Sequence, residues 1–340
     1  GGSWRVVVMG GRTGTKAGWQ PDQPWTGAGR PCHRLTAGPH SAAASALPMS
    51  PGDLYAILAA VFWSFCVILM RISGFKIPPV ALTLFKSSVA VIFFVLALPI
   101  LGEPFFHHLP AWDHVRLALS AILGITIADT LFAAALSRLG ASLQALADCI
   151  YSPSMAAVGY LMFGELLGAW EWIGGALVGA GVAVGMRVTA EVHTRRDLIL
   201  GVLLAAGAHI IMAVGILMVR DIFETLSVVW VSAYRFLIAS VSLAALALLR
   251  WPPREVFAGF IRVETWKTMI PMSFLGPFLA TIFWTAGFKY LPAGRAAIYN
   301  QLSTAFIIVL AVFLLKERMT RRKLIGVGLA VAGALFVSLQ

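Results

Sequence analysis

The chain has 340 residues, of which 59% are hydrophobic and only 12% are charged. Soluble domains carry about 25% charged residues, so this composition excludes a soluble protein and indicates a membrane protein. The formal net charge of +11 does not indicate a nucleic-acid partner, because the basic residues stand between apolar runs rather than on one soluble face. The three cysteines, Cys32, Cys66 and Cys149, have no metal-ligand spacing, so neither a metal site nor a disulfide framework is expected.

Residues 1–48 differ from the rest of the chain. They combine Gly, Pro, Arg and Trp without periodicity, and they contain no apolar run of spanning length and no signal-peptide core. Two interpretations stay open: a disordered tail, or upstream sequence that precedes a true start at Met49.

From Asp53 onward the apolar runs follow one another closely. A helix needs about 20 apolar residues to cross the hydrocarbon core of a membrane. The pattern predicts an all-α membrane protein with ten spans, at 53–71, 79–101, 115–137, 141–163, 168–187, 197–219, 227–249, 267–288, 293–315 and 321–340.

The second half of the chain repeats the first. With an offset of 152 residues, Ala145 aligns with Ala297 and Gly181 with Gly333. One offset holds over the third to fifth spans without a gap, and Lys86 in the second span matches Arg235 after small indels. We therefore expect two five-helix repeats, 53–187 and 197–340.

An odd number of spans per repeat reverses the direction in which the second copy enters the membrane. The repeats are therefore expected to be inverted about an axis in the membrane plane, an arrangement found in transporters. The odd-numbered loops carry fifteen Lys and Arg residues and the even-numbered loops carry four. By the positive-inside rule the odd loops are cytoplasmic and both termini lie on the non-cytoplasmic side.

These features resemble the ten-helix, EamA-type branch of the drug/metabolite transporter superfamily. The matching elements are Trp63, the basic residue early in the second helix of each half, the short turns "LGAS" and "LPAG", and "IGG" or "IGVG" in each fifth helix. Lys86 departs from the arginine that the family usually has there, which weakens any bidentate role. The resemblance implies inverted repeats and the export or exchange of small metabolites, often amino acids or drugs.

Two aspartates lie inside predicted spans, where a charge is costly and normally faces a cavity or a partner. Asp129 aligns with Thr281, so the fold does not require a carboxylate at this position. It is a candidate for binding an amine or relaying a proton, unless Lys86 or a helix terminus simply neutralises it. Asp148 aligns with Asn300 and is a candidate cavity-lining residue, with interhelical hydrogen bonding as the alternative.

Other polar and aromatic residues extend this candidate site. Lys86 and Arg235 could maintain the fold, bind a substrate carboxylate or snorkel toward the interface. His209 could titrate near neutral pH or be a simply hydrogen-bonded histidine. Trp63 and Trp284 could line the pathway or pack ordinarily. The remaining candidates in the ninth span are Tyr299, Asn300 and Gln301.

Small residues predict where helices approach closely. Helix packing in membranes depends on Gly and Ala because lipid offers no hydrophobic drive between helices. The two fifth helices are expected to pack against other helices, with each other as one option, through Gly174, Gly175, Gly179, Gly181, Gly326 and Gly333.

The leading functional interpretation is a secondary transporter of the inner (plasma) membrane of a bacterium that works as an exporter, with proton coupling as one source of energy and the substrate gradient as the other. No P-loop is present, so ATP drive by this chain is not expected. We expect no enzyme activity, cofactor, metal or nucleic-acid partner; the partners are the lipid bilayer and a small-molecule substrate, and the protein is a monomer or homodimer. The alternatives are an intramembrane aspartate-dependent enzyme and a non-transporting membrane scaffold.

The topology is directly testable. A reporter enzyme fused after Gln340 is expected to be active on the non-cytoplasmic side, because the basic loops hold the odd-numbered connections in the cytoplasm. A second fusion in the basic stretch Lys316–Lys323 serves as the control and is expected to report the cytoplasm. A cytoplasmic signal from the fusion after Gln340 contradicts the topology.

Overall fold

The computed structural model describes residues 51–164, 168–186, 192, 194–290 and 293–338, and within these the side chains of 171, 288–289, 293–301 and 337–338 are not described. All of these helices belong to one unit, Pro48–Gln340. The first half contains the α-helices α1 (Pro51–Gly74), α2 (Pro79–Ile100), α3 (Ala111–Ala121), α4 (Ala128–Leu139), α5 (Ala141–Asp148), α6 (Tyr151–Phe163) and α7 (Ala169–Gly185), with the π-helical segment η1 (Ile122–Ile127) between α3 and α4.

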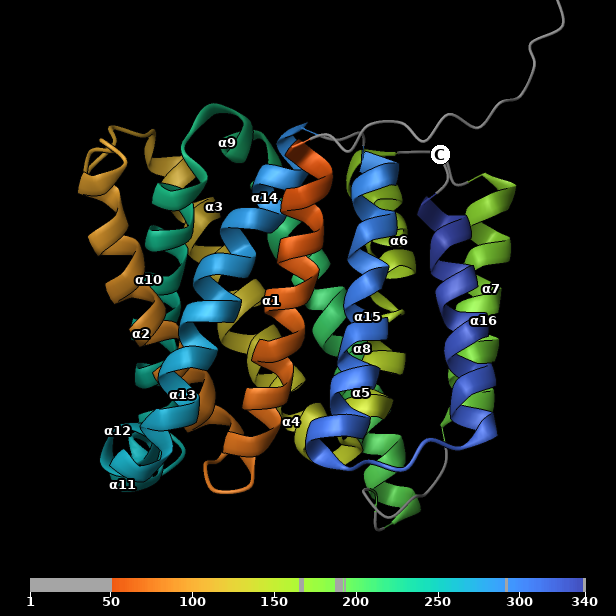
Figure 1. The fold of residues 1–340 in the computed structure, drawn as a ribbon. Helices are drawn as coiled ribbons and strands as arrows, with labels where there is room; N and C mark the ends of the chain where they lie inside the picture. Colours follow the sequence, from red (N-terminus) through yellow and green to blue (C-terminus); the bar gives the residue numbers. More distant parts are fainter. Residues whose placement is uncertain (1–50, 165–167, 187–191, 193, 291–292, 339–340) are drawn as a thin grey trace, which may run out of the picture. The chain divides into compact units, whose positions relative to one another are not determined.

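The second half has the same succession of long helices (Figure 1). Its α-helices are α8 (Arg195–Leu217), α9 (Arg220–Thr225), α10 (Val228–Leu248), α11 (Pro253–Val256), α12 (Ala258–Ile261), α13 (Trp266–Ser273), α14 (Thr281–Tyr290), α15 (Ala293–Leu315) and α16 (Arg321–Ser338), with the 3-10 turn η2 (Val263–Thr265) and the π-helical segment η3 (Phe274–Ala280).

The apolar runs predicted as helices are helical over most of their length. In the described part of the chain, six helices are long and apolar enough to cross a membrane, and two shorter apolar helices cover Trp172–Gly185 and Leu302–Leu315. The connections at 220–225 and 253–265 were predicted as loops, which is wrong, because they contain α9, α11, α12 and η2.

The fourth predicted helix, 141–163, is not continuous. It ends at Asp148 as α5 and restarts at Tyr151 as α6. In an unbroken helix the backbone nitrogen of Pro153 would have to donate to the carbonyl of Cys149, but proline has no N–H and its ring clashes with that carbonyl. The repeat places Ala305 at the matching position, and α15 runs through it without a break.

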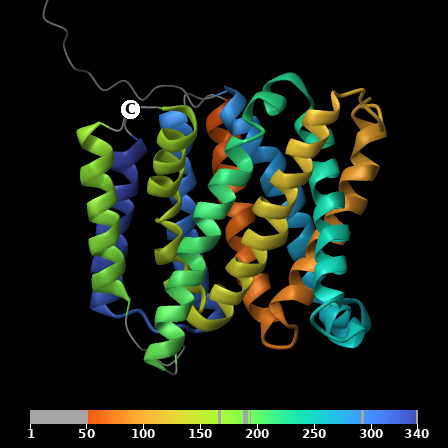
Figure 2. The same cartoon turned by 180° about the vertical axis from the view of Figure 1, so that it is seen from behind.

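The long helices of one half pack on those of the other. The most extensive pairings are α7 with α16, α1 with α15, α4 with α8, and α2 with α10. In Figures 1 and 2, α7 and α16 lie side by side in both views. The two halves therefore bury their helix faces against each other.

Glycines allow α7 and α16 to touch backbone to backbone. A Cβ added at Gly326 would lie 2.6 Å from the Cα of Gly185, and one added at Gly181 would lie 2.6 Å from the carbonyl oxygen of Gly326. The repeat-related contact is equally close, since a Cβ at Gly333 would lie 2.5 Å from the carbonyl oxygen of Gly174. A side chain at any of these positions would force the helices apart.

The GxxxG spacing formed by Gly175 and Gly179 does not mark the contact between α7 and α16. Gly175 faces α6 instead, and the expectation of close packing is wrong for Gly179. A Cβ added at Gly179 would meet nothing within 4 Å, and one at Gly175 would meet only the Cβ of Pro153, at 3.9 Å. The contact follows the helix face of Gly174 and Gly181, seven residues apart, because two helical turns return a residue to the same face.

The two π-helical segments fall at matching places in the repeats. With the offset of 152 residues, Ile122 at the start of η1 aligns with Phe274 at the start of η3. Such segments widen a helix locally and are frequent at functional sites. Each one leads directly into the stretch that carries Asp129 in the first half and Thr281 in the second.

The contact between α7 and α16 predicts opposite effects for the same substitution at two glycines. Gly326→Ala is expected to lower stability by about 1–3 kcal/mol, because its methyl group meets backbone that cannot move aside. Gly179→Ala is the control and is expected to be neutral or stabilising by up to about 1 kcal/mol, since alanine is the better helix former. Thermal unfolding of the purified variants in detergent measures both, and equal effects would contradict the assignment.

Candidate functional site

A cavity of about 230 Å³ lies between the two halves. Both halves supply its walls: α1, α2, η1, α4 and the α5–α6 break on one side, and α8, α10, η3, α14 and α15 on the other. Its walls are mostly apolar, but the acidic and basic side chains of Lys86, Asp129, Asp148, His209 and Arg235 also reach it.

Lys86 and Asp129 form a buried ion pair across α2 and α4. The Lys86 Nζ lies 2.5 Å from the Asp129 Oδ2, and the side chains are 3% and 17% exposed. Lys86 therefore does not snorkel toward the interface. Asp129 has its charge partner, Lys86, within the first half. This matches the expected alternative in which Lys86 neutralises Asp129.

Asp148 is the last residue of α5, immediately before the helix break. Its Oδ1 accepts a hydrogen bond of 2.8 Å from the amide nitrogen of Gln144 and lies 3.0 Å from the Nε2 of His209 on α8. The Asp148 Oδ2 and the His209 Nδ1 are buried and have no hydrogen-bond partner among the residues that the structure describes. This pair joins the two halves and keeps unused hydrogen-bonding capacity.

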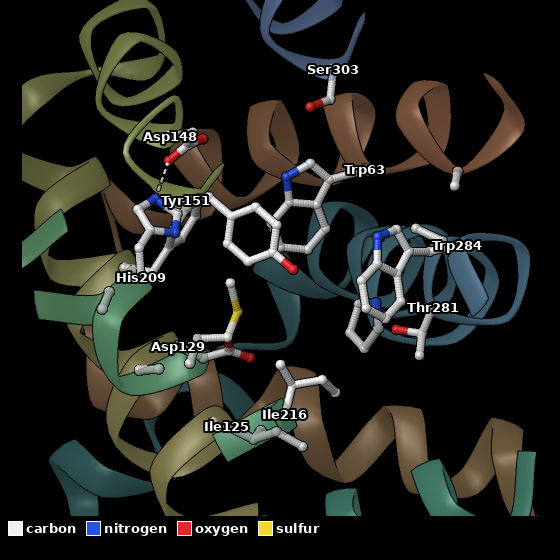
Figure 3. Close-up of a pocket in the computed structure, with 18 of the residues that line it drawn as sticks. Trp63, Ile125, Asp129, Asp148, Tyr151, His209, Ile216, Thr281, Trp284 and Ser303 are labelled. Atoms are coloured by element: carbon white, nitrogen blue, oxygen red, sulfur yellow. Dashed lines mark hydrogen bonds and ion pairs between the residues drawn. The ribbon is translucent and has the colours of Figure 1, made fainter. Parts of the chain in front are cut away.

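Aromatic side chains flank these charges. Figure 3 shows Trp63 and Tyr151 between the Asp148–His209 pair and Trp284, with Thr281 beside Trp284. The Trp63 ring packs on Phe132 with centroids 5.8 Å apart, and Tyr151 meets His209 edge-on at 5.9 Å. Flat apolar surfaces beside fixed polar groups suit a small organic ligand.

Arg235 on α10 also lines the cavity, but its environment differs from that of Lys86. The residue is 8% exposed, and its Nε is buried without a hydrogen-bond partner in the described part of the chain. The guanidinium carbon lies 5.7 Å from the centre of the Phe223 ring, so the cation rests over an aromatic face.

The structure brings most of the predicted site residues to one place. Those that line the cavity are Trp63, Lys86, Asp129, Asp148, His209, Arg235 and Trp284. The side chains of Tyr299, Asn300 and Gln301 lie outside those described. No group of three or more His, Cys, Asp and Glu in the described residues could hold a metal ion.

Several contributors to the site were not among the predicted residues. Ser232 and Met212 line the cavity, and Gln144 holds Asp148 in place. The spacing of Gln144 and Asp148, four residues apart on one helix, was a readable signal for their hydrogen bond. Met212 gave no such signal, because an isolated methionine in an apolar helix looks like any lipid-facing or core residue.

A bundle of apolar helices around a cavity with buried charges is the architecture of an integral membrane protein. The sequence model of the EamA-like transporter family matches residues 50–186 and 199–339, so the chain belongs to this family.

Two named relatives agree with this. The chain is 28% identical over 136 residues to the uncharacterized inner membrane transporter YhbE of Escherichia coli K12, covering 39% of this chain and 41% of YhbE. It is 33% identical over 126 residues to the uncharacterized transporter YetK of Bacillus subtilis 168, covering 37% and 36%. The matches thus span about two fifths of each relative.

A solved crystal structure has the same fold. It superimposes with a TM-score of 0.61 at 19% sequence identity, covering 84% of this chain and 95% of the other.

The Lys86–Asp129 pair predicts strong non-additivity. Lys86→Gln or Asp129→Asn alone leaves one buried charge without its partner and is expected to cost about 3–5 kcal/mol, whereas the double variant costs less than the sum. Unfolding of the purified variants measures the coupling. The exposed pair Arg220–Glu224, at 3.9 Å, is the control and is expected to couple by less than about 1 kcal/mol. Additive losses at Lys86 and Asp129 would contradict the pairing.

Proposed function

We propose that this protein is a secondary transporter that exports small metabolites, such as amino acids or drug-like compounds, by alternating access between two inverted five-helix repeats. The observation that carries the proposal is the cavity itself, because both halves line it and both contribute buried charges. A substrate held there would contact both halves, so their relative movement would open it to either side of the membrane.

The directions of the repeats support the inverted arrangement. In Figure 1 the chain runs downward through α7 and upward through α16, although these are equivalent helices of the two repeats. The order of loop charges agrees, with both termini on the non-cytoplasmic side of a bacterial inner membrane. The ten spans of this proposal include the shorter apolar helices as well as the six long ones.

Polar contacts between the halves lie at both ends of the bundle. At one end Arg116 on α3 donates to both carboxylate oxygens of Asp221 on α9, one at 2.9 Å, and to the carbonyl oxygen of Met218. The hydrogen bonds from Arg116 hold the pKa of the Asp221 carboxyl below its ordinary value. The carboxylate keeps its charge, and with it this contact, at any physiological pH.

At the other end the carboxylate of Glu317 accepts hydrogen bonds from the backbone nitrogens of Ala141 and Ser142, at 2.8 and 2.9 Å. These are free N–H groups at the start of α5, where a carboxylate is favourable. Figure 1 shows α9 and the α15–α16 connection at opposite ends. Alternating access would break one of these contacts while the other persists.

The Asp148–His209 pair is the candidate for proton coupling. It bridges the halves through the contact between the Asp148 Oδ1 and the His209 Nε2, and the Asp148 Oδ2 and the His209 Nδ1 are buried without a partner among the described residues. A proton taken up by this pair would weaken or strengthen the bridge between α5 and α8, which links protonation to the movement of the halves.

The two alternatives have less support. In an aspartate-dependent enzyme two carboxylates share a proton, but here Asp129 is paired with Lys86 and Asp148 with His209. A scaffold without transport gains nothing from charges around a buried cavity, since each costs free energy in the membrane.

Transport in proteoliposomes tests the function. A ligand is first identified by its stabilisation of the purified protein, in a screen of amino acids, nucleosides and cationic drugs, and its flux is then measured against pH. Asp148→Asn is expected to abolish the pH dependence and lower the flux by about tenfold or more, because about 1.4 kcal/mol of lost hydrogen bonding is a factor of ten. Asp129→Asn is tested in parallel.

The control is Glu224→Gln, which removes an exposed carboxylate and is expected to leave the flux and its pH profile unchanged. If neither aspartate variant alters the rate or the pH profile, the assignment of these groups is wrong. If no ligand crosses the membrane faster than in protein-free vesicles, the proposal of transport fails.

A further inference from the structure

Lys86 and Arg235 occupy equivalent positions in the two repeats, but only one of them has a counter-ion of its own. Lys86 is paired with Asp129 at 2.5 Å. Arg235 makes no ion pair and no hydrogen bond in the part of the chain that the structure describes, and its Nε is buried without a partner. The difference between the repeats lies in the carboxylate rather than in the cation.

The repeat explains why this carboxylate is missing. The residue that neutralises Lys86 is Asp129, and its equivalent in the second half is Thr281. Both Thr281 and Arg235 line the cavity. At the place where the first half supplies a negative charge to its buried cation, the second half supplies a hydroxyl group.

The cost of this arrangement is large. A guanidinium stays protonated in proteins, and a buried charge normally has a partner and a complete set of hydrogen bonds. The ring of Phe223 covers one side of the cation, which does not replace an anion. The charge of Asp129, which lines the same cavity, also acts on Arg235, but this carboxylate is already paired with Lys86.

The surroundings of Arg235 keep space for the guanidinium and add a donor. A Cβ at Gly124 on η1 would lie 3.0 Å from the Arg235 Nη2, so glycine there leaves room for the guanidinium. Ser232, one turn before Arg235 on α10, also lines the cavity, and its Oγ is buried with no hydrogen-bond partner among the described side chains. Two unused donors therefore face the same cavity.

We propose that Arg235 and Ser232 form an anion subsite that binds a carboxylate of the transported substrate. The carboxylate accepts hydrogen bonds from the guanidinium, a geometry that arginine favours, and from the Ser232 hydroxyl. The apolar part of the substrate lies against the rings of Trp63 and Trp284. The substrate carboxylate thus supplies to Arg235 the negative charge that Asp129 supplies to Lys86 and that Thr281 lacks. This subsite rests on the proposed transport function, since it names the class of substrate: small organic carboxylates.

Binding of paired probes tests the subsite. The purified protein in nanodiscs of neutral lipid is titrated with benzoate, phenylacetate and hexanoate, and with the neutral amide of each, by calorimetry and thermal shift. The carboxylates are expected to bind about 10- to 100-fold more tightly than their amides, the range for hydrogen bonds to a charged group. Absence of any carboxylate preference over this panel overturns the proposal.

Three variants locate the effect. Arg235→Gln is expected to remove the preference, and Arg220→Gln, which removes an exposed cation of the same half, is expected to retain it. Thr281→Asp restores in the second half the carboxylate that Asp129 provides in the first, so it is expected to neutralise Arg235 from within and to abolish carboxylate binding. If Arg235→Gln does not fold, the test relies on Thr281→Asp. A Thr281→Asp variant that still binds carboxylates more tightly than their amides overturns the proposal.

The binding readout needs no gradient and no transport. A protein that prefers carboxylates but moves no ligand across a proteoliposome would contradict transport and leave the subsite standing. A protein that transports a ligand but binds acids and amides equally would contradict the subsite alone.

Discussion

The need to compensate buried charges is the constraint on which this structure depends. Lys86, Asp129, Asp148, His209 and Arg235 all reach one cavity inside apolar helices, where an isolated charge is costly. Pairing Lys86 with Asp129 ties α2 to α4, and pairing Asp148 with His209 ties α5 to α8. The same interactions that make the charges tolerable therefore hold the helices around the cavity.

Irregular backbone accompanies these charges. The π-helical segment η1 ends two residues before Asp129, and α5 stops at Asp148. Backbone of this kind is tolerated within a membrane only where protein or a cavity surrounds it. Because the equivalent α15 is continuous, the two repeats differ at the cavity while they agree at the contact between α7 and α16. The repeats therefore agree where α7 and α16 pack together, and they differ where residues line the cavity.

Much of the fold was predictable because a membrane reduces the choices. Hydrophobic length placed the helices to within a few residues, and the repeat predicted that Gly181 and Gly326 lie in a packing face. The break after Asp148 was not predicted, because the apolar pattern continues through this stretch. Pro153 was the available signal for the break. Composition did not predict α9, α11 and α12, because these helices are too short to show an apolar periodicity in the sequence.

The sequence alone determined the class of protein, the duplication and the set of charges that needed an explanation, because each follows from hydrophobic length, a constant offset or the cost of a buried ion. It did not determine which charge meets which. Asp129 could have bound a substrate amine or Lys86, and only the packing of α2 on α4 brings Lys86 to it. Only the tertiary structure also decided that Arg235 makes no ion pair within the described residues, because pairing depends on distances between helices that no one-dimensional pattern contains.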